Sequence, residues 1–186
     1  MAVADNLVKE CEEKMKRSMS VIQQELAGIR TGRANAGLVE HVKVDYYGNL
    51  VPLKQIASVS VPDSKTIEIR PWDKNAGAPI EKALLTSDLG LTPQRQGDAI
   101  RLNLPPLTEE RRNEFLKVAK KMAEDGRVSL RNVRHETNNK LKGAKDQGVT
   151  DDEFRKMTAT VQKLTDAYIA KVDELLAGKE RELHTI

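Results

Sequence analysis

The sequence predicts an α+β protein in which an elongated three-helix bundle is interrupted by a small β-rich domain. Apolar residues recur every three or four positions in three long segments, which is the spacing of amphipathic helices. Between the first and second of these segments, apolar residues alternate instead, and all seven prolines lie between residues 52 and 106. Aromatic residues make up only 3% of the 186 residues, which favours an aliphatic core built by long helices.

Residues 3–29 are predicted to form the first helix. Its apolar residues form a narrow seam of the kind that faces partner helices. The seam consists of Val8, Cys11, Met15, Met19, Ile22, Leu26 and Ile29. Cys11 is the only cysteine, so no internal disulfide is possible, and its place in the seam predicts a buried thiol rather than a nucleophile.

Residues 31–105 are predicted to form a small α+β domain. A short helix is expected over residues 78–88, with Pro79 near its first turn. Because Tyr46 and Tyr47 point to opposite faces of a strand, at least one is expected in the core, and Trp72 is expected to pack rather than to stack on a base. Turns are predicted at 47–49 and 62–64, and strands are predicted around 42–46, 59–61, 67–69 and 100–104.

Residues 108–146 are predicted to form the second helix. Thr108 is a suitable N-cap, and Glu109 and Glu110 suit the positive end of the helix dipole. Gly126 lies on the apolar face, where it lets a neighbouring helix come close or is simply tolerated at a cost of about 1 kcal/mol. The predicted apolar face consists of Phe115, Ala119, Met122, Gly126, Val133 and Ala144.

Residues 150–180 are predicted to form the third helix. Thr150 and Glu153 have the spacing of a capping box, in which each side chain bonds a free backbone N–H. Asp151 and Asp152 could instead be a catalytic carboxylate pair, but capping explains the segment without catalysis. The predicted seam consists of Phe154, Met157, Val161, Leu164, Tyr168, Val172 and Leu175.

The three seams predict a discontinuous bundle domain, residues 1–30 and 106–186, with residues 31–105 inserted. An isolated amphipathic helix is marginal in water, so the seams must meet. At about 1.5 Å per residue the second helix is close to 60 Å long, which predicts an elongated molecule with the insert at one end.

The basic charge is concentrated in the second helix. The formal net charge of the chain is only +3, but residues 107–148 hold eleven basic and seven acidic side chains. One stripe of the helical wheel contains Lys120, Arg127, Arg131, Arg134, Asn138 and Lys145. No carboxylate lies between Asp125 and Glu136, and arginine suits phosphate oxygens and exposed bases. The stripe therefore predicts a phosphate-binding surface, and a solvated basic face explains it about as well.

Nothing in the sequence predicts an enzyme. The three histidines are scattered, no Cys/His set has metal-ligand spacing, and no glycine-rich loop cradles a phosphate, so neither a metal nor a cofactor is expected. No apolar run approaches the roughly 20 residues of a membrane span, and the start of the chain resembles neither a signal nor a transit peptide. The chain is therefore expected in the cytoplasm. A coiled-coil adaptor is the main alternative function, and the alternating insert fits it poorly.

Longer motifs resemble the ribosome recycling factor family along nearly the whole chain. They occur in the family's order: IRTGRA at 29–34, VDYYG at 44–48, PLKQIASVSV at 52–61, PWDK at 71–74, IEKALLTSDLGLTP at 80–93, LPPLTEERR at 104–112, LRNVR at 130–134 and VQKLTD at 161–166. The resemblance implies a three-helix bundle with an inserted β/α/β domain. It also implies a monomer that binds RNA of the large ribosomal subunit and splits spent ribosomes together with elongation factor G, which hydrolyses GTP.

The resemblance also implies the functional residues. It adds Arg112 to the stripe, so that the predicted RNA contacts are Arg112, Lys120, Arg127, Arg131 and Arg134. It places a hinge in two connecting stretches, Arg30, Thr31, Gly32, Arg33 and Ala34 on one side and Leu104, Pro105, Pro106 and Leu107 on the other. Many relatives carry another basic residue where this chain has His135, which is mostly neutral at pH 7 and is left out of the contacts.

Overall fold

The structure, a computed structural model, describes residues 2–185 and falls into two compact units. The first contains the N-terminal helix as far as Leu26 together with Val118–Lys179. The second contains Ala27–Lys117 and the chain from Glu180 onward. These limits lie outside the predicted insert on both sides, so the ends of two long helices count with the second unit, and the insert of residues 31–105 stays a prediction.

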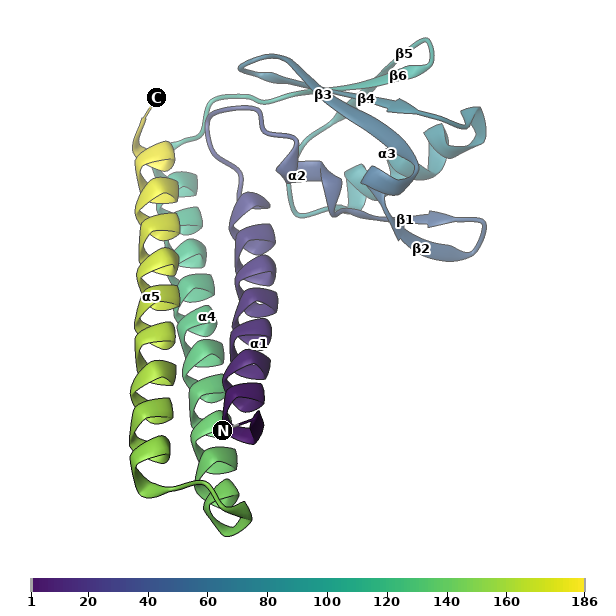
Figure 1. Ribbon diagram of the computed structural model, residues 1–186. Helices are drawn as coiled ribbons and strands as arrows, with labels where there is room; N and C mark the ends of the chain where they lie inside the picture. The colour runs from purple at the N-terminus through teal and green to yellow at the C-terminus, as the bar shows by residue number, and fades with distance from the viewer. Residues whose placement is uncertain (1, 186) are drawn as a thin grey trace. The chain divides into compact units, whose positions relative to one another are not determined.

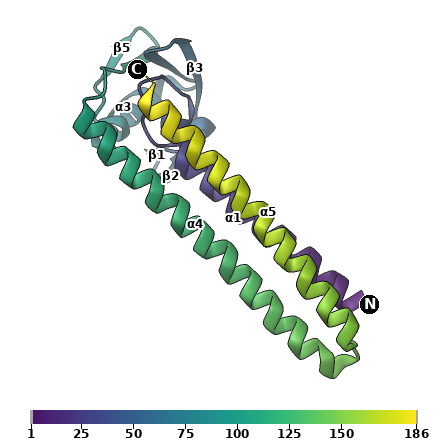
Figure 2. The ribbon, with the colours of Figure 1, turned by 90° about the vertical axis from the view of Figure 1, so that its left-hand side faces the viewer.

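Three long helices lie side by side in the first unit (Figures 1 and 2). They are α1 (Ala2–Ala27), α4 (Glu109–Ala144) and α5 (Asp151–His184). The predicted α+β fold with a helical bundle is confirmed. The third helix runs four residues further than predicted, and within residues 2–185 no helix is long and apolar enough to cross a membrane.

Polar pairs fix the direction of the helices. Lys140 Nζ lies 2.8 Å from Glu10, Lys14 Nζ lies 2.7 Å from Glu136, and the hydroxyls of Ser18 and Ser129 are 3.3 Å apart. As the residue number rises in α1 it falls in α4, so these helices are antiparallel. The pairs Arg134–Gln162 and Arg127–Asp173 show in the same way that α4 and α5 are antiparallel.

Close approach of α1 and α4 depends on Gly126. Gly126 is buried, and a Cβ built on it would lie 2.6 Å from Cδ1 and 2.7 Å from Cγ1 of Ile22. The buried face of α4 differs in part from the predicted one, because Phe115, Met122 and Val133 are only half-buried. The buried residues are Ala119, Ala123, Gly126, Leu130, Thr137, Leu141 and Ala144. Small side chains on this face allow the helices to pack closely.

Both predicted helix starts are confirmed. The Thr108 hydroxyl accepts a hydrogen bond from Arg111 N at 3.2 Å. The Thr150 hydroxyl accepts one from Glu153 N at 3.3 Å, and the Glu153 carboxylate accepts one from Thr150 N at 3.0 Å. Gly148, which closes the preceding turn, has a φ of 96°, a backbone conformation that glycine adopts without strain.

The second unit is built on two antiparallel sheets. A hairpin of β1 and β2 forms one, and the other has the strand order β3-β4-β6-β5. The strands are β1 (Lys43–Tyr46), β2 (Asn49–Pro52), β3 (Ala57–Asp63), β4 (Thr66–Pro71), β5 (Pro93–Gln96) and β6 (Ala99–Asn103). The helices are α2 (Gly37–Glu40), η1 (Leu53–Gln55), η2 (Lys74–Ala76) and α3 (Gly77–Thr86), and η3 (Lys145–Gln147) belongs to the first unit. The four predicted strands and the short helix are present.

Two short strands and α2 were not predicted. Strand β2 ends in Pro52 and β5 begins with Pro93, and β5 is otherwise polar, so neither shows apolar alternation. Prolines at the ends of edge strands are compatible with pairing, because no ladder N–H is lost there. The turn predicted at 62–64 lies slightly later, since β3 continues to Asp63 and pairs it with Thr66.

At least one of Tyr46 and Tyr47 contacts the core, as expected, but Tyr47 lies in a turn and not on the other face of a strand. Tyr46 packs against the core, whereas the Tyr47 side chain is 71% exposed. Tyr47 (φ 50°) and Gly48 (φ 80°) form the two-residue hairpin turn between β1 and β2. The expectation that Trp72 packs is wrong: it follows the end of β4 and is 69% exposed.

Candidate nucleic-acid interface

The basic stripe of α4, defined by Lys120, Arg127, Arg131, Arg134, Asn138 and Lys145, borders the buried face of the helix. Lys120 and Arg131 are exposed, whereas Arg127, Arg134 and Asn138 are half-buried. The turn of the helix that carries Arg127 also carries Gly126 on the packed face. The stripe therefore lies at the flank of the bundle, at the border between packed and exposed surface.

Arg127 is held by two carboxylates. Its guanidinium lies 2.6 Å from Asp173 of α5 and 3.0 Å from Glu124, and its side chain is only 19% exposed. Hydrogen bonding to Asp173 raises the pKa of Arg127 above its ordinary value, and Glu124 adds to the effect. Arg127 therefore joins α4 to α5, and its charge is already balanced.

Arg131 shares the Glu124 carboxylate with Arg127. The distance from Arg131 Nη1 to Glu124 Oε1 is 3.1 Å, and hydrogen bonds from Arg127 and then Arg131 lower the pKa of Glu124. The prediction that the arginines have no counter-charge is wrong for these two. The carboxylate-free stretch 126–135 did not exclude these partners, because Glu124 is three residues before Arg127 and seven before Arg131, and Asp173 comes from another helix.

Arg134 has no carboxylate partner in the part of the chain that the structure describes. Its Nη1 donates a hydrogen bond to Oε1 of Gln162 at 3.3 Å, and Gln162 in turn donates to Asp166 at 2.9 Å. A neutral amide orients the guanidinium without cancelling its charge. Because Glu124 and Asp173 balance Arg127 and Arg131, Arg134 is the one of these three arginines without a direct counter-charge among the described residues, and Asp166 lies one hydrogen bond further away.

The ends of the stripe differ from the prediction. Lys145 lies beyond the end of α4 in η3, where its ammonium is 2.7 Å from Asp151 and 4.4 Å from the centre of the Phe154 ring. Its function there is to close the loop before α5. Asn138 Oδ1 is buried and has no hydrogen-bond partner among the described residues. Asn138 and Lys145 are therefore the residues of the stripe least suited to bind a phosphate.

Arg112 and the predicted hinge residues lie in the second unit. Arg112 is half-buried, and its Nε has no hydrogen-bond partner among residues 2–185. Arg30 is buried, and its Nη2 donates a 2.5 Å hydrogen bond to the Pro105 carbonyl. Burial lowers the pKa of Arg30, and the charge of Arg111 lowers it further. This hydrogen bond ties together the two connecting stretches of the predicted hinge.

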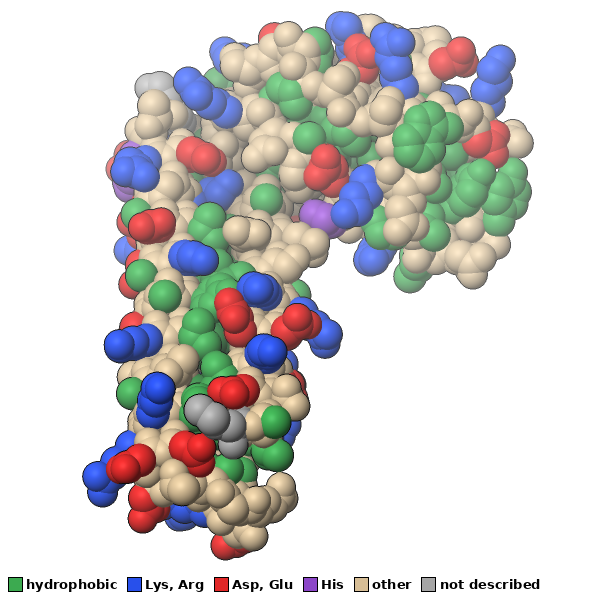
Figure 3. All heavy atoms as spheres, in the orientation of Figure 1, with side chains coloured by type: hydrophobic (Ala, Val, Ile, Leu, Met, Phe, Trp, Pro, Cys, Tyr) green, Lys and Arg blue, Asp and Glu red, His purple; other side chains and the backbone are tan. Residues whose placement is uncertain are grey.

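Sequence reasoning missed the residues that shape the stripe. Glu124, Gln162 and Asp173 determine which arginines are balanced, and two of them come from α5. Gln162 and Asp173 could have been found by pairing the flanks of α4 and α5 as antiparallel helices. Figure 3 shows that basic and acidic side chains both lie along the bundle, on either side of a band of hydrophobic ones.

Comparison with known proteins identifies the family. The sequence profile described as ribosome recycling factor matches residues 22–183. The chain belongs to the ribosome recycling factor family. Members of this family are non-enzymatic translation factors, so the chain is not an enzyme.

Relatives and solved structures match over almost the entire chain. The ribosome-recycling factor of Oleidesulfovibrio alaskensis is 49% identical and that of Geobacillus kaustophilus 50%; the matches cover 96% and 97% of this chain and 98% of each relative. A solution structure of the ribosome recycling factor has a TM-score of 0.75 at 42% identity, with 98% of each chain covered. A second structure, described as models for the T. thermophilus ribosome recycling factor and the E. coli elongation factor G bound to the E. coli post-termination complex, has a TM-score of 0.68 at 48% identity. The match covers 97% of this chain and 98% of that one.

Proposed function

We propose that this chain binds the RNA of the large ribosomal subunit in post-termination complexes and takes them apart with elongation factor G, which uses GTP. The T. thermophilus relative has been placed with elongation factor G on such a complex. We further propose that the chain acts in the cytoplasm as a monomer with no cofactor of its own. Sedimentation near the 20.8 kDa mass of one chain would support the monomer and disfavour a coiled-coil adaptor.

Arg134 carries the proposed RNA contact. Its guanidinium is oriented by Gln162 and has no carboxylate partner among the described residues, so binding a phosphate requires no ion pair to be broken. Arg131, three residues earlier, is bonded to Glu124 in an exposed pair, and such pairs contribute about 0–1 kcal/mol. A phosphate can therefore replace Glu124 at Arg131. Lys120 extends the proposed surface of the first unit, and Arg112 is proposed as a separate RNA contact of the second unit. Arg127 contributes least because its charge is balanced.

The proposal predicts that Arg134→Ala weakens binding to large subunits by about 1–3 kcal/mol. The log–log dependence of affinity on salt should become shallower by about one unit, because one fewer counterion is released. The measurement is a salt titration of binding to purified large subunits. The free energy of unfolding, measured in urea, should change by no more than about 0.5 kcal/mol, as for other surface substitutions.

Three further variants make this measurement specific. Arg134→Lys separates charge from shape, since lysine keeps the charge but lacks the planar fork. Lys163→Ala removes an exposed cation of α5 and should leave binding unchanged. Arg127→Ala should lower stability more than binding, because it breaks the link to Asp173. Parental affinity and salt slope in Arg134→Ala would show that the stripe is only a solvated face.

A further inference from the structure

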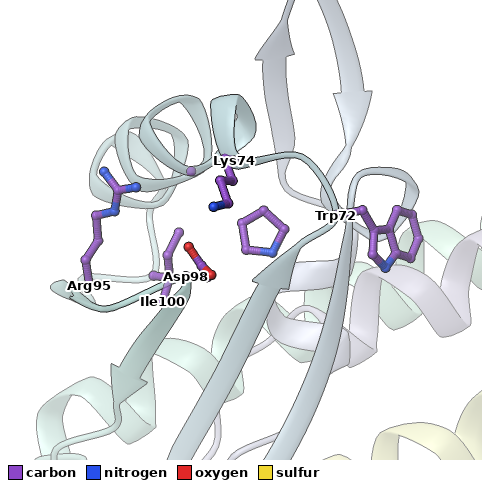
Figure 4. A pocket seen from close by; sticks show the side chains of 7 residues that line it. Trp72, Lys74, Arg95, Asp98 and Ile100 are labelled. Carbon is purple, nitrogen blue, oxygen red and sulfur yellow. The ribbon is translucent and has the colours of Figure 1, made fainter.

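The second unit contains a pocket with unbalanced positive charge beside an exposed indole. The pocket has a volume of about 180 Å³ and is lined by Pro71, Trp72, Lys74, Gly77, Arg95, Asp98 and Ile100. Lys74 from η2 and Asp98 from the β5–β6 turn point into it, Arg95 extends from β5 beside α3, and Trp72 lies beyond Pro71 on the other side (Figure 4). The lining thus combines two cations, one carboxylate and one large aromatic ring.

The two cations of this pocket have no counter-charge held against them. Neither Lys74 nor Arg95 has a hydrogen bond or an ion pair with any residue of the described chain, and Asp98 is not within ion-pair distance of either. By contrast, Arg70 and Arg101 of the same sheet are both paired with Glu68, at 2.6 Å and 3.2 Å. The pocket can therefore bind an anion through Lys74 and Arg95, and all of its lining residues belong to the second unit.

Hydrogen bonds hold the pocket's aromatic side in place. Asp73, between Trp72 and Lys74, accepts hydrogen bonds from Asn75 N at 3.0 Å and from the Tyr46 hydroxyl at 2.8 Å. The more distant Tyr47 hydroxyl, at 3.4 Å, bonds the same carboxylate. An exposed ring on a fixed backbone loses little freedom when a flat ligand stacks on it. Figure 3 shows hydrophobic side chains exposed on this unit.

Gly77 provides the space for Arg95. A Cβ on Gly77 would lie 2.9 Å from Arg95 Nη2 and 3.4 Å from its Cζ, so the guanidinium lies against the glycine. The backbone of Gly77 is ordinary α-helix, with φ −59° and ψ −49°, so alanine fits there without strain. The glycine is therefore needed for the position of Arg95 and not for the conformation of the chain.

We propose that this pocket is a second nucleic-acid site, in which Lys74 and Arg95 bind a backbone phosphate of a single strand and Trp72 stacks on an adjoining base. Cations along a backbone combined with an aromatic platform are the usual elements of single-strand binding. That the strand is RNA rests on the proposed function, whereas the pocket chemistry does not. Asp98 weakens the site, because its carboxylate repels the same phosphate.

The test uses the fluorescence of Trp72, the only tryptophan in the chain. An unstructured RNA oligonucleotide, such as oligouridylate, is titrated into the full-length protein at low salt, and quenching should be saturable. Lys74→Ala and Arg95→Ala should each weaken binding at least threefold and make the log–log salt dependence shallower by about 0.7. Trp72→Ala, followed through a dye on the RNA, should weaken it about fivefold or more.

Two variants separate the proposal from a folding defect. Gly77→Ala keeps every charge but displaces Arg95, so it should weaken binding without lowering stability, since alanine favours helix. Asp98→Asn removes the repelling charge and should tighten binding about two- to fivefold, a gain that misfolding cannot produce. Lys54→Ala, an exposed cation outside the pocket, should change nothing.

The outcomes distinguish this site from the stripe on α4. In the Arg134→Ala variant, the RNA oligonucleotide should quench Trp72 fluorescence normally, whereas binding to large subunits should be weak. Each proposed site can therefore fail without the other. An absence of quenching, or quenching unaffected by all of the pocket variants, would overturn the proposal. Equal quenching by poly-glutamate would also overturn it, because the surface would then bind acidic protein segments, and quenching by inorganic phosphate alone would exclude a nucleic-acid site.

Discussion

Gly126 tests how closely the helices must pack. Two effects of replacing Gly126 by alanine oppose each other. Alanine stabilises a helix interior by about 1 kcal/mol relative to glycine, whereas overpacking a core costs about 1–3 kcal/mol. Because Ile22 is buried and its Cγ1 and Cδ1 would both meet the new Cβ, the steric cost should win. Gly126→Ala is therefore expected to lower the free energy of unfolding by up to about 2 kcal/mol, measured by urea denaturation.

Gly143 provides the matched control for that substitution. It lies in the same helix, is exposed, and has nothing within 4 Å of an added Cβ. Gly143→Ala should therefore stabilise the protein by about 0.5–1 kcal/mol. Shortening Ile22 to Val should recover part of the loss in Gly126→Ala, and a double-mutant cycle measures this coupling. If both glycine variants are equally stabilised, close approach at Gly126 is not required.

The environments of Cys11, Trp72 and Arg131 differ in how far the sequence could predict them. Cys11 was placed correctly in a buried seam, and burial raises the pKa of its thiol, because helical periodicity determines which face is packed. Trp72 was misplaced, since an apolar ring after a strand gives no sign of its exposure. The balance of Arg131 could not be predicted, because its partner Glu124 is outside the usual i±4 spacing.

At the scale of the element, the start of α5 has a capping box whose two side chains, Thr150 and Glu153, can be replaced separately. Thr150→Ala leaves the Glu153 N–H without its side-chain acceptor, and losing such a cap costs about 0.5–2 kcal/mol. In a chain of this size, a change of 1 kcal/mol moves the melting temperature by about 2–4 °C. Thr150→Ser keeps the hydroxyl and should melt close to the parent.

The other half of the capping box makes the stability depend on pH. Hydrogen bonds from the Thr150 N–H and hydroxyl lower the pKa of Glu153. A carboxylate with a lowered pKa stabilises the fold above its unfolded pKa, about 4.3, and this contribution is lost as pH falls through the folded value. Glu153→Gln should therefore be less stable than the parent at pH 7, and the difference should shrink below about pH 4. A difference that stays constant with pH would mean that the carboxylate charge plays no part in the cap.

Whole elements were predictable to the extent that they repeat a pattern. The three helices extend over many turns, so both caps and the helix ends could be read within a few residues. Their seams were only partly right, because several predicted seam residues of α4 and α5 are half-buried. Strands β2 and β5 contain four residues each, and their pairing comes from neighbours rather than from their own sequence. The pocket beside Trp72 needs η2, β5 and α3 to meet, which only tertiary structure determines.

At the scale of the whole molecule, the predicted insert should be removable. The buried side chains of the first unit come mainly from α1, α4 and α5, all of which lie outside residues 31–105. Arg30 bonds the Pro105 carbonyl, so the two ends of the cut lie close enough for a short Gly/Ser linker to join Arg30 to Pro106. The shortened chain is expected to unfold cooperatively, with a higher helical fraction than the parent by circular dichroism.

The same shortened chain separates the two proposed RNA sites. It keeps Arg134 and loses Lys74 and Arg95, so it should bind large subunits with a salt dependence that still changes on Arg134→Ala. It should not support disassembly with elongation factor G if the inserted domain and its hinge serve that later step. Leu130→Asp in the shortened chain, which places a charge in the bundle core, is the control for a folded state. Little helix or gradual melting would show that the bundle needs the insert, and full disassembly activity would show that the insert and hinge are dispensable.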